Sequence, residues 1–343
     1  MKSNKYSIMN QSFDTYSASG KRYSRPSLFK RCGRSGILLP RISLGFWHNF
    51  GEADLYSRCR ETALYAFDNG IVHFDLANNY GPPPGSAEQT LKRLLEEDLG
   101  PYRDELFISS KAGYEMWEGP YGNWGSRKSL MASIDQSLKR TGLDYFDLFY
   151  SHRYDPETPL EETLQALADI VRSGKALYIG LSRWPEEACS TAFRYLEERD
   201  VPCLIYQGRL NILDREVIRK KILDKVHDNG CGFIAFSPLA QGLLSDRYLN
   251  GIPRDSRMAR EHFLKSSVLT EELLKKLELL QELAFQRGES LATMSLAWIL
   301  QHKEVTSVLT GASSARQLAQ NLACLDSAPF SRDEMEAIDL IVK

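Results

Sequence analysis

Three short apolar runs of this sequence each end in a side chain that could take part in proton transfer. Asp75, Lys111 and His152 stand at these ends. Tyr80 follows Asp75 by five residues, in a segment of Asn and Gly residues typical of a loop. Neighbouring strands lie about 4.8 Å apart. If the three runs are neighbouring strands, their ends and the loop with Tyr80 therefore form one cluster.

An Asp, a Lys, a His and a Tyr in one cluster suit the reduction of a carbonyl group. A free tyrosine titrates at about 10, and we expect the ammonium of Lys111 to lower this pKa in Tyr80. Asp75 would keep Lys111 charged, and His152 would donate a hydrogen bond to the carbonyl oxygen. A hydride then reaches carbon while Tyr80 gives its proton to oxygen. Taken singly, each residue also suits a turn, surface or packing role, and only their joint placement favours catalysis.

The chain that must position these residues alternates short apolar runs with helical patterns. Stripes with helical spacing occur at Leu160, Leu164, Leu167 and Val171 and at Leu273, Leu277, Leu280 and Ala284. Strands separated by helices predict a parallel sheet covered on both faces. Eight such units favour a single (β/α)8 TIM barrel, with its active site at the C-terminal ends of the strands. The eight runs are residues 42–46, 71–76, 106–110, 145–150, 176–181, 203–206, 232–236 and 306–310.

A doubly wound sheet shows the same alternation and stays open as an alternative on pattern alone. If such a sheet bound a dinucleotide, it would usually carry a Gly-x-Gly-x-x-Gly turn. The sequence has no such motif, and it has no phosphate loop with Gly-Lys-Ser or Gly-Lys-Thr. The barrel is therefore the favoured prediction.

Two regions are expected along the chain. Residues 1–28 are rich in Ser, Tyr and charged residues without a clear period, which predicts a loose extension. Residues 29–343 form the barrel domain. It begins with a β-hairpin, whose turn at residues 33–36 has apolar residues on both sides. We expect this hairpin to cap the bottom of the barrel.

Composition and charge exclude several classes of protein. The chain is 43% hydrophobic and 26% charged, with a net charge of −2. It therefore lacks the excess of positive charge that is typical of proteins that bind nucleic acid or an anionic membrane. No apolar run approaches the roughly 18 residues of a membrane span, and the polar start is unlike a secretory signal. A cytoplasmic protein is expected. The six cysteines are scattered and no metal-binding motif occurs, so we expect reduced thiols and no metal site.

The segment from His73 to Gly81, with Lys111 and His152 after the next runs, resembles the catalytic Asp-Tyr-Lys-His set of the aldo-keto reductase superfamily. The resemblance extends from residue 29 to the C-terminus. Residues 81–88, 113–122 and 241–253 are similar to bacterial L-glyceraldehyde-3-phosphate reductases, whose wider branch includes potassium-channel β subunits. The resemblance implies an NADP(H)-dependent reductase of small aldehydes or ketones, with assembly as a tetramer or octamer.

The resemblance also implies where the cofactor NADP(H) would bind. The residues at its nicotinamide end would be Ser182, Arg183, Gln207 and Phe236, the last as an aromatic ring against the nicotinamide face. Many reductases have Asn where this chain has Arg183. The loop over the pyrophosphate would contribute Ser237, Leu239 and Gln241.

The other end of the cofactor carries phosphates, for which a helix N-terminus is a ready anion site. The adenosine-phosphate site would comprise Gly311, Ser313, Gln317, Gln320 and Asn321, although a Glu is usual at position 320. Arg247 and Arg257 would meet the 2′-phosphate that distinguishes NADPH from NADH, because an Arg can bind a phosphate bidentately.

A substrate pocket is expected around the loops after the first and third strands. Trp47, Tyr114 and Trp117 would supply aromatic walls for a small carbonyl compound. Arg127 and Lys128 begin the predicted helix after the third strand, where a cationic pair and a helix N-terminus could hold a substrate phosphate. A solvated pair of charges is the plain alternative.

Two further functions compete with a reductase. A regulatory β subunit of a potassium channel would bind NADP(H) with little turnover, but such subunits typically carry Asn where this chain has His152. A short-chain dehydrogenase needs Tyr-x-x-x-Lys, and none of the 16 tyrosines has Lys four residues later. The short-chain dehydrogenase is therefore excluded, and the channel β subunit is disfavoured.

Overall fold

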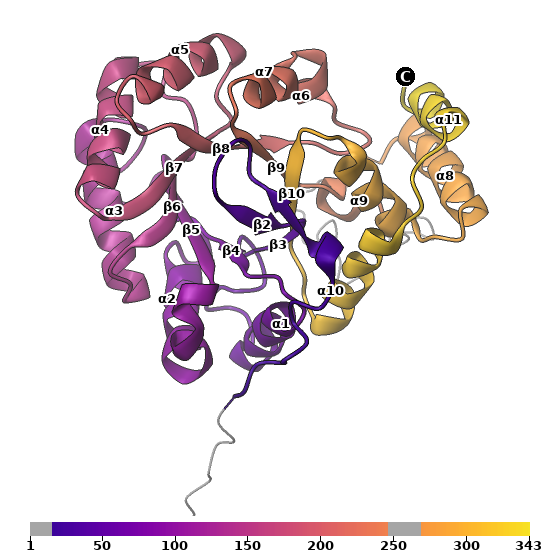
Figure 1. The fold of residues 1–343 in the computed structure, drawn as a ribbon, viewed down its shortest axis with the longest axis horizontal. Coiled ribbons are helices and arrows are strands. Elements are labelled where there is room, and N and C mark those ends of the chain that lie inside the picture. Colours follow the sequence, from indigo (N-terminus) through magenta and orange to yellow (C-terminus); the bar gives the residue numbers. More distant parts are fainter. Residues whose placement is uncertain (1–15, 246–268) are drawn as a thin grey trace, which may run out of the picture.

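Eight parallel strands close into a barrel surrounded by helices in the computed structural model, which describes residues 16–245 and 269–343 (Figure 1). The strands follow one another around the ring in chain order, and the last pairs with the first. The predicted TIM barrel is thus confirmed. The barrel strands are β3 (Ile42–Gly45), β4 (His73–Asp75), β5 (Phe107–Ala112), β6 (Phe146–Ser151), β7 (Ala176–Ser182), β8 (Cys203–Arg209), β9 (Gly232–Phe236) and β10 (Val305–Thr310).

In the described ranges, helices alternate with these strands, with α6 and α7 together between β8 and β9 and with α8 and α11 outside the repeat. α8 and α11 pack against each other at one flank of the barrel (Figure 1). The helices are α1 (Tyr56–Asp68), α2 (Ser86–Leu94), α3 (Arg127–Thr141), α4 (Leu160–Arg172), α5 (Glu186–Glu197), α6 (Glu216–Arg219), α7 (Ile222–Asp228), α8 (Glu271–Gln286), α9 (Leu291–Gln301), α10 (Ala315–Leu322) and α11 (Arg332–Val342). Short 3-10 or π turns span Pro26–Leu28, Leu95–Leu99, Gly100–Glu105, Ala240–Gly242 and Ala323–Asp326.

Two predicted strands differ from the observed ones by three residues in length, which is the largest difference among the eight. The run 71–76 forms only the short β4, whereas β8 continues three residues beyond the predicted end at 206. The added residues of β8 are more polar than a buried strand usually is, and hydrophobic pattern alone could not find them. The extension matters because it places Gln207 on a barrel strand.

A two-stranded hairpin of β1 (Phe29–Arg31) and β2 (Leu38–Pro40) covers the N-terminal ends of the barrel strands, as predicted. Lys30 donates to the carbonyl oxygens of Lys303 and Val305, at the start of β10. Gly33 has a φ of +54°, and a Cβ there would lie 2.1 Å from the carbonyl oxygen of Gly230, so only glycine fits this turn. The predicted catalytic residues Asp75, Lys111 and His152 lie at the opposite ends of the barrel strands.

The loose extension expected for residues 1–28 differs from the structure in its second half. Residues 1–15 lie outside the described residues. Beyond them, Tyr16 and the backbone of Ser19 both donate to Asp68 on α1. Arg22 forms an ion pair with Glu105 at 2.8 Å. These contacts fix residues 16–28 on the barrel surface, because polar residues without a period can still be ordered by specific long-range partners.

The interior matches the predicted pattern. Leu164 and Leu167 of α4 and Leu277, Leu280 and Ala284 of α8 are all buried. The six cysteines are free and buried. Within residues 16–245 and 269–343, no helix is long and apolar enough to cross a membrane.

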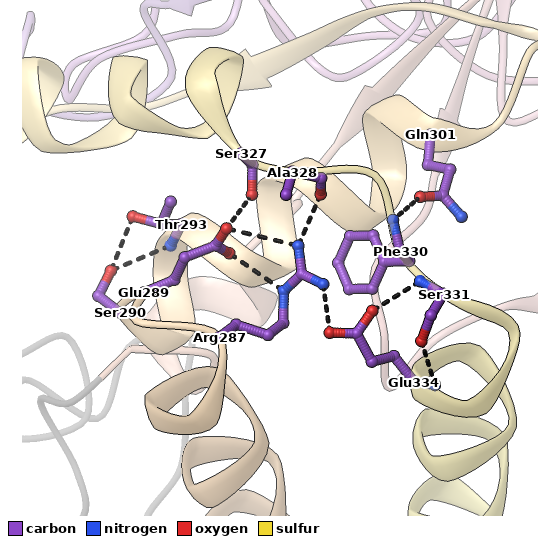
Figure 2. Close-up of polar contacts among 10 residues, drawn as sticks. All are labelled: Arg287, Glu289, Ser290, Thr293, Gln301, Ser327, Ala328, Phe330, Ser331 and Glu334. Carbon is purple, nitrogen blue, oxygen red and sulfur yellow. Dashed lines mark hydrogen bonds and ion pairs between the residues drawn. The ribbon is translucent and has the colours of Figure 1, made fainter.

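A buried arginine ties the C-terminal helix to the rest of the barrel (Figure 2). The side chain of Arg287 is only 5% exposed and pairs with Glu334 of α11 at 2.6 Å and with Glu289 at 3.4 Å. It also donates to the carbonyl oxygen of Ala328 and lies 3.9 Å from the centroid of Phe330. One guanidinium therefore joins α8, the segment before α11, and α11 itself.

Arg287→Met should lower the free energy of unfolding by about 3 kcal/mol, because it leaves two partly buried carboxylates without their partner. Arg332→Met is the matched control. Arg332 is 89% exposed and, among the described residues, pairs only with Glu336, so its loss should cost less than about 1 kcal/mol. Urea unfolding of both variants measures the difference. Equal small losses would show that the Arg287 cluster contributes little to stability.

Candidate active site

The register of the barrel brings the predicted catalytic residues together at the C-terminal ends of three adjacent strands. Asp75, the last residue of β4, pairs with Ser109 of β5, and Lys111 lies two residues further along β5. Lys111 is aligned with Tyr150 of β6, so His152 follows just beyond that strand. The backbone N–H of His152 donates to the carbonyl oxygen of Ala112 at 2.8 Å and fixes its position.

Tyr80 reaches this cluster from the loop that joins β4 to α2. Its carbonyl oxygen accepts hydrogen bonds from the backbone N–H groups of Gly85 (3.1 Å) and Ala87 (3.3 Å). Its own N–H donates to the carbonyl oxygen of Ala77 at 3.0 Å. These bonds tie the backbone of Tyr80 to the start of α2. The ring is consequently held over the strand ends, where it is 8% exposed.

Lys111 joins Asp75 to Tyr80. Its ammonium lies 2.5 Å from Asp75 Oδ2, 2.6 Å from the carbonyl oxygen of Leu76 and 3.2 Å from the hydroxyl oxygen of Tyr80. An ammonium group has three donors, so these three contacts use all of them. Because the Tyr80 oxygen accepts from Lys111, its own proton is directed away from the lysine and is available to another acceptor.

The pKa of Tyr80 differs from the sequence-based expectation. Burial, followed by the charge of Asp75, raises this pKa well above its ordinary value, and Arg183 opposes the rise. The net lowering expected from Lys111 is wrong, because burial outweighs the contact with its ammonium, and the charge of Lys111 is also paired with Asp75. Burial also lowers the pKa of Lys111, while Asp75 opposes that change. Tyr80 therefore keeps its proton at neutral pH.

His152 faces Tyr80 and is neutral. The centroids of the two rings are 5.8 Å apart at an interplanar angle of 72°. Burial lowers the pKa of His152 well below its ordinary value, and the nearby charges of Lys111, Arg183 and Arg153 act in the same direction. A neutral imidazole donates one N–H, so His152 can bind a carbonyl oxygen without adding a charge.

Asp75 is supported by a hydrogen-bond chain that sequence reasoning missed. Ser109 donates to Asp75 Oδ1 at 2.8 Å, so its oxygen must accept from His73 Nε2, 3.1 Å away. His73 Nδ1 then accepts from Ser43 at 2.9 Å, and the Ser43 oxygen accepts from Ser307 at 2.7 Å. Every bond in the chain points towards the carboxylate. The one sign of this chain in the sequence was that polar residues occur inside otherwise apolar runs.

The predicted nicotinamide-end residues stand around the same cluster. Gln207 donates from Nε2 to Asp75 Oδ1 at 3.2 Å. Ser182 ends β7, and Arg183 follows it in a left-handed conformation with a φ of +57°. The Arg183 guanidinium donates to the hydroxyl of Tyr114 at 3.1 Å and lies 6.0 Å from the centroid of Phe236, the last residue of β9.

The other predicted cofactor residues follow β9 and β10. The turn after β9 holds Ser237, Leu239 and Gln241, and the first and last of these have positive φ values. After β10 come Gly311 and Ser313, and the latter donates to Gln317 Oε1 from its N–H and its hydroxyl. α10 carries Gln317, Gln320 and Asn321. Arg247 and Arg257 lie outside the described residues.

Several buried polar atoms in this set suit a polar ligand. Ser182 Oγ, Gln241 Oε1 and Asn321 Nδ2 are buried and have no hydrogen-bond partner among the described residues. A buried polar group without a partner is costly. The three atoms lie at the end of β7, in the turn after β9 and on α10. The residues present thus fit a long polar cofactor that supplies the missing partners.

The predicted substrate residues divide into two groups. Tyr114 packs edge-on against His152, with centroids 4.7 Å apart. Trp47 and Trp117 are half-buried in the loops after β3 and β5. Arg127 instead pairs with Asp169 of α4 at 2.5 Å, and Lys128 lies 5.1 Å from the ring of Tyr121. No contact in the described structure joins Arg127 or Lys128 to the catalytic cluster.

No group of three or more His, Cys, Asp or Glu residues suited to a metal ion occurs in the described ranges.

His73 makes stability depend on pH. Burial is the main reason that the pKa of His73 falls to about 4 in the folded protein. In the unfolded chain, the pKa of a histidine is about 6.5. Between pH 6.5 and pH 4, the unfolded chain therefore binds more protons than the folded protein. The contribution of His73 to the free energy of unfolding is full above pH 6.5 and is lost as the pH falls towards 4.

His73→Gln keeps a donor and an acceptor but does not titrate. From about pH 7.5 to about pH 5, wild type should therefore lose about 2 kcal/mol more unfolding free energy than this variant. Denaturant titrations at the two pH values measure this. Parallel losses in both proteins would contradict a buried, neutral His73.

Comparison with known proteins agrees with this geometry. Residues 41–343 match the Aldo/keto reductase family. The chain is 54% identical over 326 residues to the L-glyceraldehyde 3-phosphate reductase of Escherichia coli K12, with 94% of each chain covered. It is 33% identical over 329 residues to a probable voltage-gated potassium channel subunit beta of Oryza sativa subsp. japonica, covering 92% of this chain and 96% of the relative. The resemblance found in the sequence is confirmed, and the chain belongs to the aldo/keto reductase family.

Proposed function

We propose that this oxidoreductase uses NADPH to reduce small aldehydes, with Tyr80 as the general acid. The observation that carries the proposal is the Asp75–Lys111–Tyr80 arrangement, in which the lysine donates to the tyrosine oxygen. That contact leaves the tyrosine proton free for a substrate. His152 stands opposite as a neutral donor. Together these groups can bind and protonate a carbonyl oxygen.

The residues divide the work of reduction between them. His152 donates to the carbonyl oxygen and orients it, and Tyr80 transfers its proton to that oxygen. Lys111 stabilises the phenolate that remains, because its ammonium already contacts the Tyr80 oxygen. Asp75 holds Lys111 in place. When bound, NADPH supplies the hydride that reaches the carbonyl carbon.

The family relationship supports a nicotinamide cofactor. Within the proposal, Ser182 and Gln207 hold its nicotinamide end, Phe236 lies against the ring, and Asn321 contacts the adenosine end. The preference for NADPH over NADH rests on the resemblance of Arg247 and Arg257 to basic residues that meet a 2′-phosphate. Each charge-assisted hydrogen bond contributes about 1.5–3 kcal/mol, so two such arginines would suffice for a strong preference.

The substrate class follows from the relatives. A protein 54% identical to this chain is named L-glyceraldehyde 3-phosphate reductase. A short aldehyde, phosphorylated or not, is also consistent with Tyr114 as a wall of the substrate site, since that ring packs on His152. Glyceraldehyde and its 3-phosphate are therefore the first substrates to test.

Tyr80→Phe should lower kcat for glyceraldehyde reduction by about 10²- to 10⁴-fold, because it removes the proton donor and keeps the ring. NADPH affinity should stay unchanged. Absorbance of the nicotinamide follows turnover, and fluorescence quenching follows NADPH binding. The assay is repeated with NADH, for which a slower reaction is expected.

Tyr195→Phe is the matched control, since that hydroxyl contacts Gln165 between α4 and α5. It should leave kcat unchanged. Wild-type turnover in Tyr80→Phe would overturn the role of Tyr80. A wild-type protein that binds NADPH yet reduces no aldehyde would favour the regulatory function instead.

A further inference from the structure

Arg153 follows the last catalytic residue and is held in a fixed position beside the cluster. Its guanidinium carbon is 4.3 Å from the ring centroid of Tyr114 and 3.5 Å from that of Trp124. Nε donates to the carbonyl oxygen of Gly113 at 2.8 Å, and Nη2 donates to Asn123 Oδ1 at 2.7 Å. Two rings and two hydrogen bonds therefore orient this planar group before any ligand binds.

Within the described residues, Arg153 has no carboxylate partner, and its Nη1 has no hydrogen-bond acceptor. Asp155 is the acidic residue that acts on its charge. The Asp155 oxygens, however, accept from Gly125, Glu157 and Thr158 instead. Five other partly buried arginine side chains do meet a carboxylate, namely those of Arg22, Arg103, Arg140, Arg215 and Arg287, whereas Arg41 donates to the carbonyl oxygen of Leu300.

The charges around His152 are also unbalanced. Lys111, Arg183 and Arg153 all act on His152. Lys111 is neutralised by Asp75, but neither arginine forms an ion pair with a described residue. The two arginines repel one another, as the lowered pKa of Arg153 reflects, with burial as its main cause. An anion beside His152 would relieve this repulsion.

We infer that Arg153 binds the phosphate of a short phosphorylated aldehyde whose carbonyl group lies at Tyr80 and His152. The inference rests on the proposed function and names the anchor for its substrate. The ring of Tyr114 contacts both His152 and the Arg153 guanidinium, so the anchor is one aromatic ring away from the reacting carbonyl. That spacing suits a substrate only a few carbon atoms long. A guanidinium fork with a free edge matches phosphate oxygens.

This assignment replaces the phosphate site expected at Arg127 and Lys128. Arg127 already has a carboxylate partner in Asp169 and is half exposed, and its backbone N–H donates to Glu162. Its charge is therefore neutralised on the outer surface between α3 and α4. Arg153 has the opposite properties: it is fixed, lacks a carboxylate partner and lies next to the catalytic histidine.

The test compares Arg153→Met, Arg127→Met and Arg332→Met in the full chain. Steady-state reduction of glyceraldehyde 3-phosphate and of glyceraldehyde is measured with NADPH. Arg153→Met should raise KM for the phosphorylated substrate by about 10- to 100-fold, the effect of one charge-assisted contact. KM for glyceraldehyde, both kcat values and NADPH binding should change little. Arg153→Lys, which keeps the charge without the fork, should fall between wild type and Arg153→Met.

Calorimetric binding of glycerol 3-phosphate, which has no carbonyl group, gives a readout that does not need turnover. Wild type, Arg127→Met and Arg332→Met should bind it alike, and Arg153→Met should bind it at least about tenfold more weakly. If wild type reduces neither aldehyde, the proposed function fails, and this binding series still decides the role of Arg153.

Three results would overturn the inference. Equal KM increases for both aldehydes in Arg153→Met would mean that Arg153 only supports the loop at residues 113–125. A selective loss in Arg127→Met would move the phosphate site to α3. Wild-type turnover of glyceraldehyde with no preference for the phosphorylated form would remove the anion site and leave the proposed function intact.

Discussion

The buried ion pair between Lys111 and Asp75 is the interaction on which the rest of the site depends. Neither side chain is more than 2% exposed, so burying their charges costs several kcal/mol per ion unless every donor and acceptor is used. Lys111 uses its three donors on Asp75, Leu76 and Tyr80. Asp75 accepts from Lys111, Ser109 and Gln207. Tyr80 is thereby held as the third partner of a saturated ammonium group.

The barrel offsets the cost of burying this ion pair, because its strands place the hydrogen-bond donors of Asp75 in register. Ser109 is aligned with Asp75 across β4 and β5, and Gln207 arrives from β8 on the far side of the ring. The chain from Ser307 through Ser43 and His73 to Ser109 spans four neighbouring strands, β10, β3, β4 and β5. The closed ring thus gives one carboxylate donors from several strands, which an isolated hairpin could not do.

The barrel and the clustering of Asp75, Tyr80, Lys111 and His152 could be predicted from the sequence because both follow from local pattern. Alternating runs locate the strands, and Asp75, Lys111 and His152 stand at their ends. The supporting chain was missed, since the polar residues Ser43 and Ser307 inside apolar runs say nothing about which neighbours they will meet.

Loop positions were harder to predict for a different physical reason. Arg127 begins the helix after β5 and Arg153 directly follows β6, and neither position shows in the sequence which partner its side chain will meet. Only the folded loop stacks Trp124 on Arg153 and turns Arg127 towards Asp169. Long-range contacts decide such pairings, and spacing along the chain does not encode them. The roles of the predicted cofactor residues remain predictions.

The central claim is that Lys111 acts on the reaction through Tyr80, so that the two side chains form one unit. A double-mutant cycle on kcat with Tyr80→Phe, Lys111→Met and the double variant tests it most directly, with NADPH binding and thermal unfolding measured to show that each protein is folded. Residues that act as a unit give strongly non-additive losses. The double variant should therefore be about as slow as the slower single variant. Losses that multiply would contradict the account, because Lys111 would then act independently of Tyr80.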